Sequence, residues 1–337
     1  MYYNGENGYL SLLKDTLANG ENKLTRNGNV ISIFGCMIHF KNISSAFPLI
    51  TSKKMFFRGI VEELLWFLRG STNANELKSK KIHIWDGNST REYLDSIGLD
   101  YPEGELGPIY GWQWRKFGKE YEVNSEKCNE ETKEDIYNDM NSTDADTSTD
   151  TDTDSSSYIY TDTDTDTYNK GVDQIKYILE ELSKDNNSRR AVLSAWNPID
   201  LKKMALPPCH ILYIFNKSSN GLSCHMTLRS SDLFLGLPFN IASTALLTQI
   251  LAHILHIPAH EVCLSICDAH IYEEHTLQVN KQIDSELYDF PKVIIKKDAP
   301  DIKSSIDVKI KWIEGLVYED FELSNYKSGA SLSAIMK

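Results

Sequence analysis

The sequence lacks a long uninterrupted hydrophobic run, a dense set of cysteines and any excess of basic residues. The longest apolar stretch, 241–257, is broken by serine, threonine, glutamine and histidine, so we predict a buried helix there and no membrane span. Six cysteines in 337 residues do not form the framework of a small disulfide-rich domain. The N-terminus shows no basic segment followed by an apolar one, which predicts no signal peptide and a reducing, cytoplasmic setting.

The acidic charge is concentrated in one segment. The formal net charge is −13, yet residues 122–170 alone hold 15 of the 48 acidic residues and three of the 35 basic ones. The rest of the chain is therefore nearly neutral, and no nucleic-acid-binding surface is indicated. Residues 141–167, almost entirely threonine, aspartate and serine, have too little apolar surface to offset the entropy of ordering. We predict a disordered insertion there, within a single domain that spans 1–337.

Hydrophobic periodicity predicts helices and strands in no regular alternation. Helices are expected over 1–20, 58–68 and 172–182 and again after Pro238, where the chain is apolar nearly all round. Strands are expected over 30–40, with a bend at Gly35, and over 191–196, 210–216, 222–230, 292–297 and 308–312. Because strand–helix–strand units do not repeat, the α+β class is favoured over a doubly wound sheet.

The motif ALPPCH places Cys209 at the start of an apolar strand, after two prolines that fix the approach of the chain. A lone cysteine is most often a buried structural residue. Here Arg189, Arg190, Arg229 and His210 are candidate neighbours, and a cysteine near arginines is biased toward the nucleophilic thiolate. Clustered arginines also bind phosphate. The combination predicts covalent catalysis on a phosphorylated substrate.

Eight motifs follow one another in a specific order: FPLITSKK, EELLWFLRGSTN, IWDGN, GPIYGWQWR, SRRAVLSAWNP, MALPPCH, LGLPFNIAS and DAHIY. Over residues 5–121 and 171–326 the chain resembles the folate-dependent thymidylate synthases that use a cysteine nucleophile. The resemblance implies a large mixed sheet covered by helices, whose free face packs on the same face of a second subunit in a homodimer. No reductase domain precedes the matching region, so the resemblance is to the monofunctional form.

The resemblance implies reductive methylation of dUMP to dTMP, with 5,10-methylenetetrahydrofolate as co-substrate and dihydrofolate as product. Cys209 matches the nucleophile that adds to C6 of the uracil ring, and Glu63 matches the acid that organises water and proton transfer. Its neighbour Glu62 is expected to be an exposed helix acid. Tyr110 and His210 complete the expected catalytic group together with Asn240, whose amide can pair with both N3–H and O4 of uracil.

The remaining site residues are implied by the same match. Arg26, Arg229 and Ser230 match phosphate ligands, and the pair Arg189 and Arg190 matches arginines that reach into the neighbouring subunit's site. His270 and Tyr272 match groups that hold the deoxyribose 3′-hydroxyl. The folate-side residues are Lys53, Trp85, Asp232 and Gly236, and no metal is expected.

Several alternatives stay open at this point. Asn240 could instead cap the helix that follows it. Because the tail ends in Lys337 where the family has an apolar residue, water could trap the methylene group and the enzyme would be a dUMP hydroxymethylase. An inactive scaffold whose acidic insertion recruits a partner is a third possibility, and the insertion could also bind a cation. A histidine and cysteine cluster could also bind zinc, although its spacing fits no zinc motif; it comprises His253, His256, His260, Cys263, Cys267 and His270.

Overall fold

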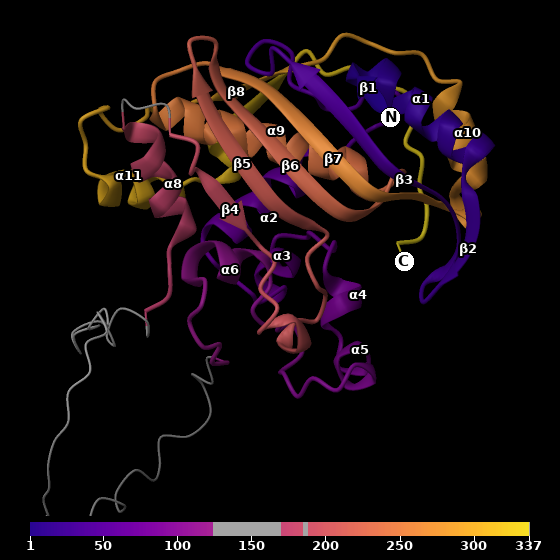
Figure 1. The fold of residues 1–337 in the computed structure, drawn as a ribbon, viewed down its shortest axis with the longest axis horizontal. Helices are drawn as coiled ribbons and strands as arrows, with labels where there is room; N and C mark the ends of the chain where they lie inside the picture. The colour runs from indigo at the N-terminus through magenta and orange to yellow at the C-terminus, as the bar shows by residue number, and fades with distance from the viewer. Residues whose placement is uncertain (124–169, 185–187, 337) are drawn as a thin grey trace, which may run out of the picture.

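The computed structural model describes residues 1–123, 170–184 and 188–336. The insertion predicted over 141–167 lies outside the described residues. The predicted α+β class is confirmed: seven strands form one mixed sheet in the order β1-β3-β7-β6-β5-β4, with β2 paired to β3 (Figure 1). The strands are β1 (Tyr2–Asn4), β2 (Glu21–Thr25), β3 (Gly28–Lys41), β4 (Val192–Ser194), β5 (His210–Ser218), β6 (Gly221–Asp232) and β7 (Ala259–Tyr272).

Helices lie behind this sheet and around its edges, and no described helix crosses the front face in Figure 1. A second, two-stranded sheet pairs β8 (Lys292–Ile295) with β9 (Phe321–Ser324). The longer helices are α1 (Gly5–Asn19), α2 (Phe57–Leu68), α6 (Tyr110–Lys116), α8 (Gln174–Ser183), α9 (Gly236–Ile254), α10 (Thr276–Ile283) and α11 (Ile306–Glu314). Shorter ones are α3 (Asn75–Ser79), α4 (Asp86–Ser89) and α5 (Arg91–Ser96).

Helix α9 forms the centre of the core. It is the expected helix after Pro238, although it begins at Gly236, because a proline in the first turn forfeits no intrahelical hydrogen bond. Its length and composition would suit a membrane span, but 78% of its most apolar window is buried inside the protein. Buried side chains lie on all sides of it, since it contacts β6 and β7 on one side and α2 on another.

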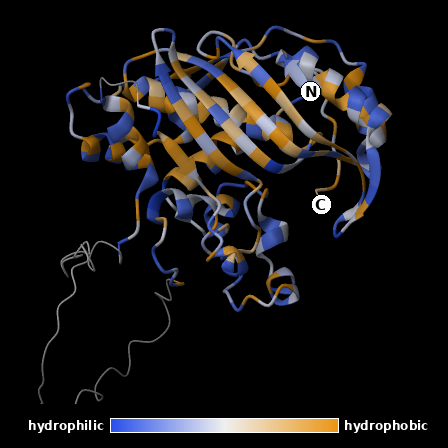
Figure 2. Cartoon of the chain, in the orientation of Figure 1, coloured by the Kyte–Doolittle hydropathy of each residue, from blue (hydrophilic) through white to orange (hydrophobic). Residues whose placement is uncertain are grey.

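The two faces of the sheet differ in exposure. On the α9 side the strands bury one residue in two, as with Cys224, Met226 and Leu228 on β6. The other face carries Phe34 at 78% exposure and Ile214 at 40%, and the hydrogen-bonded pair His225 and Ser265 crosses it. The strands therefore alternate between hydrophobic and hydrophilic residues along their length (Figure 2).

One predicted element is wrong, and several elements of the structure were not predicted. Residues 308–312, expected as a strand, belong to α11, because Ser305 caps this helix and Ile306, Ile310 and Ile313 repeat at helical spacing toward the core. The fourteen-residue strand β7 was not predicted, nor were the short β1, β2 and β9. The bend predicted at Gly35 is confirmed, since its φ of +77° lies in the region that favours glycine.

We predict that α9 packing dominates stability. Leu246 on α9 is fully buried, so Leu246→Ala should lower the free energy of unfolding by about 2–5 kcal/mol. The same substitution at Leu277 on α10, which is 63% exposed, should change it by no more than about 0.5 kcal/mol. Urea denaturation measures both values. Equal losses for the two variants would contradict this account of the core.

Candidate active site

Cys209 lies in a bend between Pro208 and the first residue of β5. Its main chain is held on both sides: its N–H donates to the Tyr110 hydroxyl at 2.7 Å, and its carbonyl accepts from Arg229 N–H at 2.9 Å. Tyr110 is the first residue of α6, whereas Arg229 is on β6, so two separate elements fix the cysteine. The double proline before it has no N–H groups to donate, which leaves its carbonyls as acceptors only.

Those carbonyls orient the guanidinium of Arg229. Nε donates to Pro208 O at 2.7 Å and Nη2 donates to Pro207 O at 2.8 Å, while Nη2 also lies 3.7 Å from the Cys209 sulfur. The Trp196 ring lies against the group, with its centre 5.9 Å from Cζ. The arginine is therefore fixed beside the thiol, and both hydrogens of Nη1 remain for a further acceptor.

The thiol is not poised as a thiolate in this structure. Burial raises the pKa of Cys209 above its ordinary value, and the charge of Arg229 lowers it by a smaller amount. The prediction that a neighbouring arginine favours the thiolate holds for the direction of the Arg229 contribution, but burial outweighs it and the net pKa of Cys209 is raised. Of the three candidate arginines only Arg229 adjoins the sulfur, while Arg189 and Arg190 are exposed.

Glu63 on α2 belongs to the same region, since its charge contributes to the raised pKa of Tyr110. Trp85 Nε1 donates to its carboxyl at 2.8 Å, and burial raises the pKa of Glu63 to about 7, with the Trp85 bond opposing the rise. The neighbouring Glu62 was expected to be exposed, and this is wrong. It is only 4% exposed and accepts a hydrogen bond from Lys80 at 2.7 Å.

An aromatic cluster surrounds these groups. The rings of Tyr110 and His210 stack with their centres 4.2 Å apart, and Phe67 and Trp85 pack against Tyr110. His210 Nδ1 lies 2.6 Å from the Tyr213 hydroxyl, and burial lowers the pKa of His210 to about 3. His210 is therefore neutral at physiological pH. It can position its neighbours, but it does not carry the positive charge of an imidazolium.

A second group of predicted residues meets around the turn between β2 and β3. Arg26 in this turn lines a hollow of about 220 Å³ together with Ser230 at the end of β6 and His270 and Tyr272 at the end of β7. Ser230 Oγ lies 3.5 Å from His270 Nδ1, which also lies 2.9 Å from Asp268 Oδ1. Asp268 was not predicted, although a residue two positions before His270 lies on the same strand face.

The loop from β6 into α9 holds the folate-side candidates. Asp232 Oδ1 accepts from the N–H groups of Phe234 at 2.8 Å and Leu235 at 3.3 Å. Lys53 is 4% exposed; it donates to Phe234 O, its Nζ lies 3.8 Å from the centre of the Phe234 ring, and burial lowers its pKa to about 7. Asn240 lies inside α9, four residues after its first residue Gly236, and the helix cap position is Leu235, so the capping alternative for Asn240 is wrong.

The structure does not bring all the predicted residues together. Arg189 and Arg190 precede β4, at the sheet edge opposite to β2 and β3, and are exposed. Among the described residues, no group of three histidines, cysteines or acids is arranged to bind a metal ion. His253 and His256 instead face main-chain carbonyls, at 3.1 and 2.9 Å.

A cysteine held beside an arginine, in the same region as a carboxyl whose pKa is raised, is the kind of arrangement that enzyme active sites use. The chain belongs to the thymidylate synthase family, a family of methyltransferases, because the family model matches residues 7–337. This agrees with the resemblance seen in the sequence motifs and with the predicted class of fold.

Curated relatives support the same assignment. The chain is 39% identical to thymidylate synthase 1/2 of Encephalitozoon cuniculi, over 95% of this chain and 93% of that protein. It is 43% identical to the bifunctional dihydrofolate reductase-thymidylate synthase of Paramecium tetraurelia, over 96% of this chain and 59% of the relative. It is 41% identical to the bifunctional dihydrofolate reductase-thymidylate synthase of Glycine max, over 90% of this chain and 50% of the relative. The chain thus spans about half the length of the bifunctional relatives that it matches.

The raised pKa of Glu63 predicts a pH dependence of stability. Because the folded carboxyl holds its proton up to about pH 7, its contribution is complete below the ordinary value of 4.5 and is lost as pH rises through about 7. The free energy of unfolding of the wild type should therefore fall relative to that of Glu63→Gln between these two values. Denaturation of both proteins at several pH values measures this difference.

Trp85→Phe supplies the matched variant. Removing the indole N–H takes away the hydrogen bond that stabilises the carboxylate, so the pKa of Glu63 should rise further. The fall in the free energy of unfolding should therefore extend to higher pH. Identical pH profiles for the wild type and Glu63→Gln would contradict the buried, protonated carboxyl. The comparison is made at constant ionic strength, since salt weakens the interactions between the other charged groups.

Proposed function

We propose that this protein is a thymidylate synthase that converts dUMP to dTMP with 5,10-methylenetetrahydrofolate, giving dihydrofolate. The observation that carries the proposal is the Cys209 sulfur, fixed 3.7 Å from Arg229 Nη2, with the Tyr110 hydroxyl bonded to its main chain. The family membership supplies the reaction, and the arrangement of these groups supports it.

Cys209 forms a bond from Sγ to C6 of the uracil ring, which leaves C5 nucleophilic. Burial raises the pKa of the thiol, so its proton passes to water as the Sγ–C6 bond forms, while the C5=C6 π bond breaks and its electrons move onto C5 and O4. Arg229 is the described cation in contact with the sulfur and stabilises the charge that develops there. Exclusion of water by the surrounding side chains strengthens this interaction.

Glu63 suits proton transfer at the pyrimidine. A carboxyl whose pKa is about 7 can both give and accept a proton at physiological pH, whereas an ordinary glutamate would stay ionised. Trp85 holds the carboxyl in place through its indole N–H. Tyr110 and the neutral His210 act as a stacked, rigid wall that positions Cys209.

Binding of dUMP uses the two groups of polar residues at the ends of strands β6 and β7 and in the turn between β2 and β3. The two hydrogens of Arg229 Nη1 and the side chains of Arg26 and Ser230 bind the phosphate. His270 and Tyr272 hold the deoxyribose hydroxyl. Asn240 pairs with N3–H and O4 of uracil, because an amide offers one acceptor and one donor group.

A cavity near the C-terminal segment has polar groups that would fit a heterocycle. A cavity of about 340 Å³ lies between α10 and the C-terminal segment around Ser333, and it is lined by His275 and Gln278. His275 Nδ1 and Gln278 Oε1 are buried without a hydrogen-bond partner among the described residues. When bound, 5,10-methylenetetrahydrofolate supplies the one-carbon unit and the hydride. Lys53, Trp85, Asp232 and Gly236 would hold it.

The exposed sheet face supports a homodimer. Phe34 and Ile214 are uncovered in the single chain, and burying such side chains favours association. In a symmetric dimer of this kind the exposed Arg189 and Arg190 are free to reach the partner's site. They would add positive charge near the phosphate and the thiol, beyond what Arg229 alone provides.

Cys209→Ser should reduce kcat to below a few per cent of the wild-type value while dUMP binding persists, because a serine hydroxyl is not ionised near neutral pH. The control is Cys267→Ser on β7, which keeps full activity. Dihydrofolate absorbance and product mass measure the outcome. Retained turnover would contradict the assignment of Cys209 as the nucleophile. A hydroxymethyl product from the wild type would show that the enzyme is a hydroxymethylase.

Mixing inactive variants tests the dimer. Arg189→Ala and Cys209→Ser should each be nearly inactive, but in a mixed dimer one site carries both defects and the other carries neither. After re-equilibration, about a quarter of wild-type activity should return, since half of the dimers are mixed and each has one intact site. No recovery, with subunit exchange shown by mass spectrometry, would mean that Arg189 serves its own subunit.

A further inference from the structure

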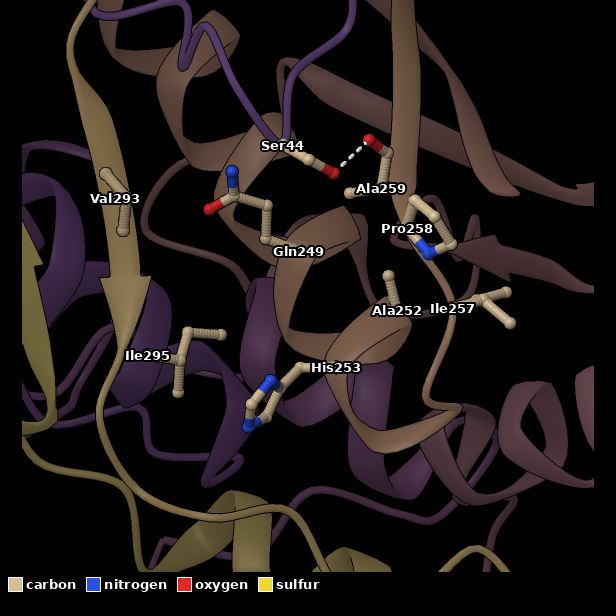
Figure 3. Close-up of a pocket in the computed structure, with 9 residues that line it drawn as sticks. All are labelled: Ser44, Gln249, Ala252, His253, Ile257, Pro258, Ala259, Val293 and Ile295. Atoms are coloured by element: carbon tan, nitrogen blue, oxygen red, sulfur yellow. Dashed lines mark hydrogen bonds between the residues drawn. The ribbon is translucent and has the colours of Figure 1, made fainter. Parts of the chain in front are cut away.

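A third pocket lies between the C-terminal half of α9 and strand β8 (Figure 3). Its volume is about 150 Å³. A single buried water needs only roughly 10–15 Å³, and a cavity of this size can accommodate one six-membered ring. We refer to it as the α9–β8 pocket. Helix α9, which forms one of its walls, lies behind the large sheet in Figure 1, on the side away from the exposed face proposed for the dimer.

Gln249 provides an unpaired acceptor on the wall of this pocket. The side chain is 7% exposed, and its Nε2 donates to Ile43 O at 2.7 Å. Because a carbonyl can only accept, this bond fixes the orientation of the amide and leaves Oε1 on the other side. Oε1 is buried and has no hydrogen-bond partner among the described residues. A buried amide oxygen without a donor costs about 1–3 kcal/mol, so a donor is favoured here.

Two further acceptors line the same pocket. His253 Nε2 lies 3.1 Å from Lys297 O and must donate to it, so in the neutral ring Nδ1 is an acceptor. Figure 3 shows the ring of His253 turned with one nitrogen toward the space between Gln249 and Ile295. Ser44 gives its hydroxyl hydrogen to Ala259 O, which leaves its oxygen lone pairs as acceptors.

The other walls are apolar, with Val293 and Ile295 from β8 and Ala252 from α9. Within the described part of the chain, no aspartate, glutamate, lysine or arginine lines the pocket. An anion would therefore lack a counter-charge and would meet acceptors only, and an ammonium ion would lack a carboxylate. A neutral molecule with a flat apolar ring and N–H donors at one end matches both the apolar wall and the wall that carries the acceptors.

We propose that the α9–β8 pocket is a binding site for a small neutral aromatic amide or amine, whose N–H groups bond to Gln249 Oε1 and His253 Nδ1. The ring would lie between Ala252 and the β8 residues. The site is independent of the proposed reaction, because Gln249 is nine residues, or about 13 Å along α9, from Asn240.

The test uses benzamide as the probe and full-length protein with isotope-labelled isoleucine and valine methyl groups. Benzamide should cause saturable NMR shifts at Val293 and Ile295, with smaller changes at Ile84 beside Trp85. Acetophenone, in which a methyl group replaces the amide NH₂, should bind at least about tenfold more weakly, because it leaves the acceptors unpaired. Equal affinity of the two compounds, or no saturable shift with benzamide, would overturn the proposal.

Substitutions in and away from the pocket test where benzamide binds. Ala252→Leu fills the pocket and should abolish the shifts, whereas Ala18→Leu on an exposed part of α1 should leave them unchanged. If Ala252→Leu fails to fold, His253→Phe keeps the ring stacked on Trp312 and removes Nδ1, and it should weaken benzamide binding severalfold. Undiminished binding in the folded variants, or shifts confined to Ile84, would place benzamide elsewhere and overturn the proposal.

Discussion

The burial of α9 against the large sheet is the constraint on which the site depends. A nineteen-residue helix that is apolar on nearly every side is stable in water only when other elements cover it, and here β6, β7 and α2 do so. The same three elements carry Arg229, His270 and Glu63. Covering the helix therefore also brings together groups that lie far apart in the sequence.

Burial has a cost that determines the chemistry of the site. It raises the pKa values of Cys209 and Glu63 and lowers those of His210 and Lys53, because every charged form loses solvation. Among the described residues Arg229 is accordingly the charged group that lies against the sulfur, and its effect on the pKa of Cys209 is smaller than that of burial. In the proposed dimer the partner's arginines would add positive charge, which favours the thiolate.

The main chain contributes as much as the side chains. Arg229 is oriented by the carbonyls of Pro207 and Pro208, and Cys209 is held by its own N–H and C=O groups. Only proline combines a missing N–H with a fixed φ, so the double proline both directs the chain and leaves two oriented acceptors. A substitution there would act on the arginine through the backbone.

The sequence by itself determined the class of fold, the family and about half of the described helices and strands, because hydrophobic periodicity and the eight ordered motifs can be recognised without knowledge of contacts. It also predicted that Arg26, Ser230, His270 and Tyr272 share a site, through resemblance, and they line one hollow.

Only the tertiary structure decided which side chains lose solvent. Glu62 and Glu63 are adjacent and alike in sequence, yet one pairs with Lys80 and the other has its pKa raised to about 7. The α9–β8 pocket likewise depends on Gln249 meeting Ile43, more than two hundred residues away. Solvation and long-range contacts depend on chain segments that are distant in sequence, so no local pattern records them.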